Sequence, residues 1–496
     1  MITIIFTFIY FIYRCVSRVN DINQLLDTSK LDTTKNFPNL IEPISKNKIY
    51  GVSLGGWLVS EPWITPELYE NITDEFGNIP LDEYSLCLKL GKDKSETYLN
   101  NHYSTFIKES DFETISKMNL NLIRIPIGYW AFGLLKDDPY IKGIQEKYLD
   151  LAIEWSKKYN LKIQIGLHAM PESQNGFDNS GKTTDNPKWL SNRKNVRLSY
   201  KIIDYVLLKY GNNSNVHSIQ VVNEPLGIKI NQKRLIKFYS DMIEKFVNLK
   251  LSAKLVFHDA FYNMESFENF YPNTYILDHH LYEIFTDWQI NSNLQEHLNH
   301  VDVNGESLSK TGQYSIVGEF SGALTDCTKY INGVGKGSRW DGTFYNQVHP
   351  ERTCKDNDEL MKNDIKLFLR KQFYTYEEKG NGWIFWTYKT NNKNNSLGWD
   401  FKRLYENDML PDPLMRYNNK IKRDDEHDEV EHRKTLKKVE DVFDIDYDLG
   451  IRKTIKLSKS GGNAIKSTAL IVLVDCYICI FLVIIFAIFF INYLTF

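Results

Sequence analysis

Short apolar runs alternate with longer amphipathic stretches between residues 50 and 399. The runs are β-branched or apolar, as buried strands are, and stretches such as 148–159 and 235–249 carry apolar residues on one helical face. This alternation is typical of βα units around a parallel sheet. Eight units predict a (β/α)8 TIM barrel within residues 45–415. Its strands are expected at 49–54, 120–125, 162–167, 218–222, 254–258, 275–277, 314–317 and 382–386.

Polar side chains and one tryptophan recur at or just after the ends of these runs. In a TIM barrel the carboxyl ends of the strands and the loops after them form the active site, so these residues are candidates for catalysis and binding. In chain order they are Glu61, Arg124, His168, Asn223, Glu224, His258, Asp259, Asp278, His279, His280, Glu319 and Trp386.

Two of these candidates, Glu224 and Glu319, follow the fourth and seventh predicted strands. A single glutamate at a strand end is more often a surface or structural carboxylate. A pair facing each other across the barrel suits a retaining glycosidase, in which one carboxyl donates a proton and the other, ~5–5.5 Å away, attacks the sugar. The pair therefore predicts glycoside hydrolysis.

Other strand-end residues suit supporting roles. Arg124 would keep a carboxylate nucleophile ionised, with a structural salt bridge as the alternative, and Asn223 would anchor a sugar hydroxyl. His168 and His280 would act as hydrogen-bonding groups. A metal site is not predicted, because no His-x-His or His-Glu-x-x-His spacing supplies a ligand set.

The two ends of the chain differ from the predicted barrel. Residues 1–18 read as a signal peptide or signal anchor, and the mixed-charge segment 416–466 as a flexible stalk or a partner-binding tail. Residues 467–494 are apolar over a length that can cross a bilayer, interrupted by Asp475. They predict a transmembrane helix or the tail of a GPI signal, and both place the barrel outside the cytoplasm at the cell surface.

Composition adds limits to these predictions. The formal net charge of −3 gives no electrostatic reason to expect nucleic acid. The aromatic fraction of 14% suits stacking on sugars but equally a large aromatic core. Three cysteines lie in the predicted barrel domain, so one disulfide is possible, for instance Cys327 with Cys354, while a free buried thiol is the alternative for each, Cys87 included. Acceptor patterns for N-glycosylation begin at Asn71, Asn212 and Asn394.

Seven motifs carry a resemblance to a known family. They are GVSLGGWLVSEPW at 51–63, RIPIGYWAF at 124–132, SQNGFDNSG at 173–181, VNEP at 222–225, DHHLY at 278–282, GEFS at 318–321 and WIFW at 383–386. In this order they resemble the fungal exo-β-1,3-glucanases of glycoside hydrolase family 5, from about residue 50 to residue 404.

The resemblance implies a retaining (β/α)8 enzyme without a cofactor that releases glucose from the non-reducing ends of β-1,3-glucan. Glu224 matches the family's acid/base and Glu319 its nucleophile. Glu61 matches a residue that binds hydroxyls of the terminal sugar, and Phe177 and Phe285 match an aromatic pair that clamps the next glucose. The other matching active-site neighbours are Arg124, His168, Asn223, His280, Tyr282 and Trp386.

Three positions depart from the family's pattern. Ala169 and Glu172 replace glycines, so the loop that contains them is expected to differ in shape. Lys336 stands where the family commonly has arginine, which would reduce a bidentate contact to a point charge and alter affinity.

Several functions therefore stay open. We expect a monomer that acts on β-glucan in cell-wall remodelling, attached to a membrane through its C-terminal segment. Transglucosylation and β-1,6- or β-1,4-glucan hydrolysis use the same chemistry, whereas a catalytically silent glucan-binding surface protein is the alternative from another class.

Overall fold

Eight parallel strands close into a barrel in sequence order, so that β1 pairs with both β2 and β8. The computed structural model describes residues 48–411 except 350, 356 and 394. All eight strands expected from the sequence are present, and the prediction of a TIM barrel is confirmed. Their bounds are β1 Ile49–Ser53, β2 Leu122–Gly128, β3 Lys162–Ala169, β4 Val216–Gln220, β5 Lys254–His258, β6 Ile276–His280, β7 Tyr314–Glu319 and β8 Gly382–Phe385.

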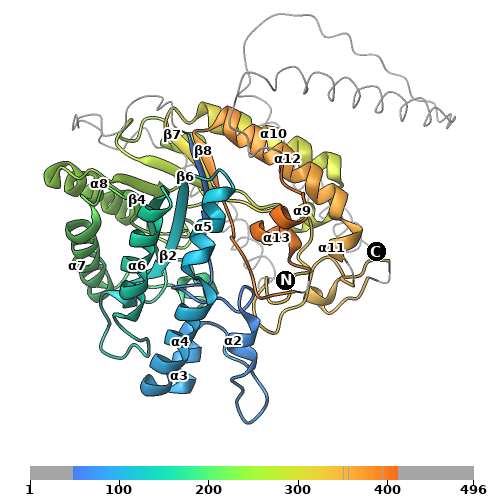
Figure 1. Cartoon of the computed structure of the whole chain (residues 1–496), viewed down its shortest axis with the longest axis horizontal. Coiled ribbons are helices and arrows are strands. Elements are labelled where there is room, and N and C mark those ends of the chain that lie inside the picture. Colours follow the sequence, from blue (N-terminus) through green and yellow to red (C-terminus); the bar gives the residue numbers. More distant parts are fainter. Residues whose placement is uncertain (1–47, 350, 356, 394, 412–496) are drawn as a thin grey trace, which may run out of the picture. The chain divides into compact units, whose positions relative to one another are not determined.

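Helices surround this barrel (Figure 1). Four of them, α2 to α5, lie between β1 and β2, and α10 and α12 pack against each other. The helices are α2 Pro66–Glu70, α3 Glu83–Leu90, α4 Lys92–Phe106, α5 Glu109–Lys117, α6 Ile144–Lys158, α7 Arg193–Tyr210, α8 Gln232–Leu249, α9 Asp287–Asn291, α10 Leu294–Lys310, α11 Asn357–Leu360, α12 Lys362–Lys379 and α13 Phe401–Glu406. Short 3₁₀ turns occupy Tyr129–Ala131, Asp178–Ser180, Met264–Phe267, Thr343–Tyr345 and Leu397–Trp399.

Several strand bounds differ from the expected ones, and the difference at β6 lies in a polar stretch. β6 continues through Asp278 and His280, where an apolar run alone predicted an end at residue 277. Those polar residues are fully or almost fully buried and still pair with β7. Backbone pairing therefore extends beyond the hydrophobic signal, because polar side chains at this end have partners inside the barrel.

The predicted leader at 1–18, stalk at 416–466 and apolar tail at 467–494 lie outside the described residues. Within residues 48–411, helices that combine the length and apolarity needed to cross a bilayer are absent.

The interior of the barrel changes character along the strands. Side chains two positions apart share one face of a strand, so Leu122 and Arg124 lie on the same face, as do Ile276 and Asp278. The first member of each pair belongs to a small apolar cluster within the strands. The second is polar and buried. The C-terminal half of the barrel interior is thus the polar half.

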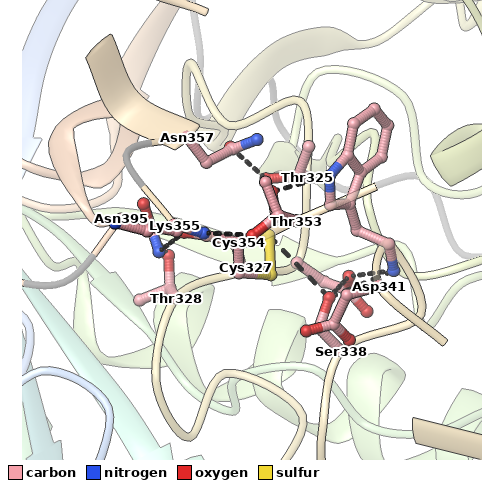
Figure 2. Close-up of a disulfide and its surroundings, with 12 residues drawn as sticks. Thr325, Cys327, Thr328, Ser338, Asp341, Thr353, Cys354, Lys355, Asn357 and Asn395 are labelled. Carbon is pink, nitrogen blue, oxygen red and sulfur yellow. Dashed lines mark hydrogen bonds between the residues drawn. A yellow bond between two sulfur atoms is a disulfide. The ribbon is translucent and has the colours of Figure 1, made fainter. Parts of the chain in front are cut away.

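A disulfide joins the two cysteines that flank a long loop after β7 (Figure 2). Cys327 and Cys354 have Cα atoms 5.2 Å apart, and the predicted pairing is confirmed. Cys87 is a buried free thiol. The side chain of Asn395 donates to the carbonyl of Cys354 at 2.6 Å, which ties this loop to the segment after β8.

Candidate active site

The carboxylate of Glu319, the last residue of β7, is held by two donors. Arg124 Nη1 donates to Oε1 at 2.6 Å, and the hydroxyl of Tyr282 donates to Oε2 at 2.8 Å. Arg124 and Glu319 are both buried, so this ion pair is shielded from water. Both contacts favour the ionised carboxylate.

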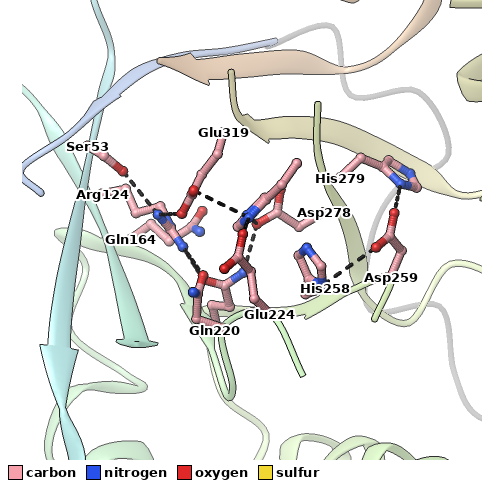
Figure 3. A network of polar contacts seen from close by, with 12 residues as sticks. Ser53, Arg124, Gln164, Gln220, Glu224, His258, Asp259, Asp278, His279 and Glu319 are labelled. Atoms are coloured by element: carbon pink, nitrogen blue, oxygen red, sulfur yellow. Dashed lines mark hydrogen bonds and ion pairs between the residues drawn. The ribbon is translucent and has the colours of Figure 1, made fainter. Parts of the chain in front are cut away.

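Arg124 is fixed from several sides, as Figure 3 shows. Its Nη2 donates to Gln220 Oε1 at 2.8 Å and to Asn223 Oδ1 at 2.6 Å, and its Nη1 donates to Ser53 Oγ at 3.1 Å. These contacts come from β1, β4 and the segment after β4. A guanidinium with this many partners is pre-organised against Glu319.

A glycine makes room for another part of this network. A Cβ atom added at Gly318 would lie 2.0 Å from Asp278 Oδ1. Asp278 Oδ2 accepts from Gln220 Nε2 at 2.7 Å and lies 3.4 Å from His280 Nε2. The Gly-Glu sequence at the end of β7 therefore lets a buried aspartate approach the backbone beside Glu319.

Glu224 lies in the segment after β4 with a positive φ of 43°. Its Oε1 lies 2.8 Å from His280 Nδ1, and its Oε2 accepts from Asn179 Nδ2 at 2.7 Å. A non-glycine residue in the left-handed region costs about 1–3 kcal/mol and persists where the surroundings over-determine it. The contacts that hold Glu224 in this conformation come from the β3 loop (residues 170–192) and from β6.

The two carboxylates are close together. His280 Nδ1 lies 2.8 Å from Glu224 Oε1 and 3.4 Å from Glu319 Oε2. The nearest carboxylate oxygens are thus no farther apart than about 6 Å, which is compatible with the close carboxyl pair, ~5–5.5 Å apart, of retaining glycosidases.

Burial and the charges of neighbouring residues set the protonation of His280, Glu224 and Glu319. Burial disfavours an imidazolium, but the carboxylates of Glu319, Asp278 and Glu224 outweigh it and raise the pKa of His280 to about 10. Burial would raise the pKa of Glu224, yet the hydrogen bond and charge of His280 hold it below its ordinary value. Burial raises the pKa of Glu319 against the opposing charges of His280 and Arg124. Both directions place the proton of the His280–Glu224 hydrogen bond on His280 and leave Glu224 ionised.

Trp386 and His168 form a stacked pair beside these carboxylates. Their rings lie 5.3 Å apart with an angle of 5° between the planes, and the Arg124 guanidinium lies 5.6 Å from the Trp386 ring. Burial and the charge of Arg124 lower the pKa of His168 well below its usual value, so the ring is neutral. Both of its nitrogens and Asn223 Nδ2 are buried without a protein partner, which leaves them available to sugar hydroxyls.

Glu61 lies in the β1 loop (residues 54–65), close enough to Glu319 and Glu224 for their charges to act on it. Trp63 Nε1 donates to Glu61 Oε2 at 2.9 Å, while Oε1 is buried and has no partner. Burial, followed by the charges of Asp178, Glu319 and Glu224, raises the pKa of Glu61 well above its ordinary value. The raised pKa favours the protonated form of Glu61, and its unpartnered oxygen suits a sugar hydroxyl.

The two phenylalanines of the expected clamp are both exposed. Phe177 lies in the β3 loop and Phe285 in the loop after β6, with 43% and 42% of their surface accessible. Phe285 packs edge-on against Tyr282, with ring centroids 5.5 Å apart. Phe285 is thus linked directly to a residue that contacts Glu319.

The departures at residues 169 and 172 have different consequences. Ala169 ends β3 in extended conformation, whereas Glu172 adopts φ 55° and Ser173 adopts φ 65°. The Glu172 carboxylate accepts from Asn192 Nδ2 at 3.0 Å and from Asn195 Nδ2 at 2.7 Å. These bonds anchor the strained residue to the start of α7.

Lys336, the third departure, is exposed. Burial and the charge of Asp82 raise the pKa of Asp178 to about 7, and the positive charge of Lys336 opposes this rise. Lys336 therefore acts on the Phe177–Asn179 segment as a point charge.

Glu224, His258 and His280 offer potential metal-ligand atoms within 4.8 Å of one another. The chemistry of His258 does not fit a metal, however. Its Nδ1 accepts the backbone N–H of Ala260 at 2.9 Å, and burial lowers its pKa well below the usual value. A neutral imidazole with this bond carries its proton on Nε2 and keeps no free lone pair.

Sequence reasoning missed Asn179, Gln220 and Trp399. Asn179 binds Glu224 Oε2, Gln220 receives two nitrogens of Arg124, and Trp399 lies 5.3 Å from the Tyr282 ring. Asn179 stands within the SQNGFDNSG motif, so its position two residues after Phe177 was the available signal. Gln220 and Trp399 carried no signal, because only the closed barrel brings them to this site.

Known proteins are similar to this chain over most of their length. A glucan 1,3-beta-glucosidase of Yarrowia lipolytica is 41% identical over 381 residues, which are 74% of this chain and 89% of that protein. A sporulation-specific glucan 1,3-beta-glucosidase of Saccharomyces cerevisiae is 40% identical over 389 residues, which are 74% of this chain and 86% of that protein. No protein-family model matches the sequence.

A rutinosidase from Aspergillus niger shares the fold, with a TM-score of 0.59 and 19% identity over 76% of this chain and 100% of that structure. The closed barrel and the adjacent carboxylates at its C-terminal end define a glycoside hydrolase. The chain belongs to the family of fungal glucan 1,3-beta-glucosidases. The resemblance found in the sequence motifs is therefore confirmed.

Proposed function

We propose that this chain is a retaining exo-β-1,3-glucosidase that removes glucose from the ends of β-1,3-glucan in cell-wall remodelling. The observation that carries the proposal is the shared contact of His280 Nδ1 with both carboxylates, at 2.8 Å and 3.4 Å. Family membership supports the substrate.

In the first step Glu319 is the nucleophile and Glu224 the general acid. A Glu319 oxygen forms a bond to the anomeric carbon as the glycosidic bond breaks, and Glu224 gives its proton to the departing oxygen. Arg124 and Tyr282, at 2.6 Å and 2.8 Å from Glu319, keep the nucleophile ionised and oriented. The product is a glucosyl-enzyme ester and a shortened glucan.

In the second step Glu224 acts as a base. It takes a proton from water, the water oxygen attacks the anomeric carbon, and the bond to Glu319 breaks. Glu224 reaches the two states that the cycle needs by exchanging a proton with His280 Nδ1, 2.8 Å away, which holds it in the free enzyme. Two inversions leave the released glucose in the β configuration.

Substrate contacts follow from the unpartnered groups. Glu61 Oε1, Asn223 Nδ2 and His168 are buried polar groups without protein partners. We assign them to hydroxyls of the terminal sugar, with Trp386 as the flat surface beneath it. The exposed rings of Phe177 and Phe285 hold the next glucose.

Laminarin turnover by the purified protein tests this proposal. We expect the wild type to release glucose, and Glu319→Gln and Glu224→Gln to lose this activity while remaining folded, as thermal unfolding shows. Glucan binding without glucose release by the wild type would instead favour the silent glucan-binding protein.

We also propose that residues 467–494 hold a monomeric enzyme at the cell surface. The support is their apolar character and the small residues before them. Release of the protein from intact cells by phosphatidylinositol-specific phospholipase C is expected for a GPI anchor, and retention for a transmembrane helix. Recovery of the full chain in the cytosolic fraction would contradict both.

A further inference from the structure

Three consecutive residues at the start of α3 hold two loops of the active site. We call Asp82, Glu83 and Tyr84 the α3 bracket. Glu83 Oε2 accepts from the backbone N–H of Ser60 at 2.8 Å and from Ser60 Oγ at 2.9 Å. These two bonds connect the bracket to the β1 loop, one residue before Glu61.

The other two bracket residues bind the β3 loop. Asp82 Oδ2 accepts from the backbone N–H of Thr183 at 2.6 Å, and the backbone N–H of Tyr84 donates to the carbonyl of Gly181 at 2.9 Å. This loop carries Phe177 and Asn179. A helix inserted between β1 and β2 thus joins the loops that follow β1 and β3.

Ser60 is constrained through each of its polar atoms. Besides the two bonds to Glu83, its Oγ lies 2.8 Å from the hydroxyl of Tyr69, which donates to the Ser60 carbonyl at 3.0 Å. The carbonyl of Glu61 accepts from the backbone N–H groups of Ile64 and Thr65 at 3.1 Å and 3.0 Å. The backbone on both sides of the Glu61 side chain is therefore fixed.

Glu83 is an unusual residue for a purely structural position. It is completely buried, and no ion pair reaches it among residues 48–411 as described. Burial raises the pKa of Glu83 to about 7, against the hydrogen bonds from Ser60 and a longer one, at 3.5 Å, from the hydroxyl of Tyr103. A carboxyl group buried without a cation is unfavourable for folding unless hydrogen bonds compensate it, and here the principal compensating bonds are those that hold Ser60.

We infer that Glu83 is a positioning residue for substrate binding, which fixes Ser60 and thereby aims the free oxygen of Glu61 at the terminal sugar. This inference rests on the proposed function, because it assigns Glu61 to a sugar hydroxyl. Glu83 acts through Ser60, whose backbone N–H and Oγ both donate to its Oε2. Its loss weakens binding and leaves the pair Glu224 and Glu319 in place.

The test compares Glu83→Met with Glu83→Gln on laminarin. Methionine fills a similar volume without an acceptor for Ser60, whereas glutamine keeps one carbonyl acceptor. We expect Glu83→Met to raise KM for laminarin and the inhibition constant of glucose by about ten-fold, the loss of one hydrogen bond in binding. We expect kcat to change by less than about three-fold, and Glu83→Gln to restore KM to within about two-fold of wild type.

Glu377→Met is the matched control. Glu377 is also buried and accepts a hydrogen bond, from the hydroxyl of Tyr50 at 3.0 Å, but it lies on α12 and contacts neither loop. We expect this variant to lower the melting temperature without raising KM. If Glu83→Met does not fold, Ser60→Ala replaces it, since that change removes the Oγ contacts and keeps the backbone bond.

The outcomes separate this inference from the proposed function. A wild type that turns over laminarin, with KM unchanged in Glu83→Met, overturns the inference alone; so does an equal rise of KM in Glu377→Met. If Ser60→Ala is the variant measured, one of the two bonds to Glu83 is lost, so a rise of KM by about three-fold is expected, and a KM equal to that of wild type overturns the inference. A wild type without any turnover of laminarin overturns the proposed function.

Discussion

The two halves of the barrel interior use the same strand faces for different purposes. In the apolar layer, Leu122 and Ile276 pack with residues of neighbouring strands, and shape alone decides the fit. Two positions further along the same strands, Arg124 and Asp278 belong to the polar layer, where each side chain depends on particular partners. The apolar layer supports stability, and the polar layer gives up some stability to hold the chemistry.

This difference makes the two layers separable by mutation. A change in the apolar layer is expected to lower stability and spare the catalytic constants of the folded enzyme. A change in the polar layer is expected to alter catalysis, with a stability cost that depends on how many partners are left unpaired.

The largest effect is expected from Glu319→Gln. Glutamine has nearly the same shape but is not a competent nucleophile, so kcat on laminarin falls by roughly 10⁴-fold or more. Thermal unfolding is measured alongside, because the neutral amide leaves the buried Arg124 without its counter-ion and some loss of stability is expected. A residual rate within ten-fold of wild type would remove Glu319 from the role of nucleophile.

Arg124→Met is expected to lower both catalysis and stability. It leaves the buried carboxylate of Glu319 without its cation and Gln220, Asn223 and Ser53 without a donor. We expect kcat to fall by about 10²–10³-fold and the free energy of unfolding to fall by about 3–5 kcal/mol. Urea unfolding and steady-state kinetics measure the two losses, and a loss of stability alone would reduce Arg124 to a structural salt bridge.

Ile276→Ala tests the apolar layer. Ile276 is 1% exposed, so its truncation leaves a cavity and lowers the free energy of unfolding by about 2–5 kcal/mol. Well below the melting temperature, kcat and KM on laminarin are expected to match wild type. A change in kcat as large as that of Arg124→Met would show that the layers are not separable.

The pH dependence of stability isolates the charged centre of the polar layer. His280 has a pKa of about 10 in the folded protein against an ordinary value of 6.5. A raised pKa stabilises the fold fully below pH 6.5, and this stabilisation is lost as the pH rises to about 10, by at most ~1.4 kcal/mol per pH unit. The gap in unfolding free energy between wild type and His280→Asn is therefore expected to shrink over this range. A gap that stays constant or grows would contradict the assignment of a positive charge to His280.

The smallest effect is expected at the rim of the site. Phe285 is half-exposed, so Phe285→Ala costs little stability but removes a stacking surface for the second glucose. We expect KM for laminarin to rise by about ten-fold or less, with kcat on an aryl β-glucoside, which lacks that sugar, unchanged. An equal effect on both substrates would place Phe285 at the terminal sugar instead.

The sequence was sufficient to predict the barrel and the proximity of Glu224 and Glu319. The apolar runs gave all eight strands, because burial of a parallel sheet imposes a strong local pattern. β2 ends later than predicted, at Gly128. The end of β6 was also misplaced, since its polar residues depend on partners from other strands. Gln220 and the bracket residue Glu83 were missed for the same reason: their partners Arg124 and Ser60 are distant in sequence.

The departures from the family's motifs were only partly interpretable from the sequence. Replacement of glycine at position 172 predicted a changed loop, yet Glu172 adopts a positive φ and is held by Asn192 and Asn195. A propensity rule gives the cost of such a conformation but not the contacts that offset it.

The configuration of the first-formed glucose tests the central claim most directly. Proton NMR during the first minutes of laminarin hydrolysis distinguishes the two anomers before mutarotation mixes them. Two carboxylates bridged by His280 predict β-glucose as the initial product. Initial α-glucose would mean a single displacement, and Glu319 would then not be the nucleophile.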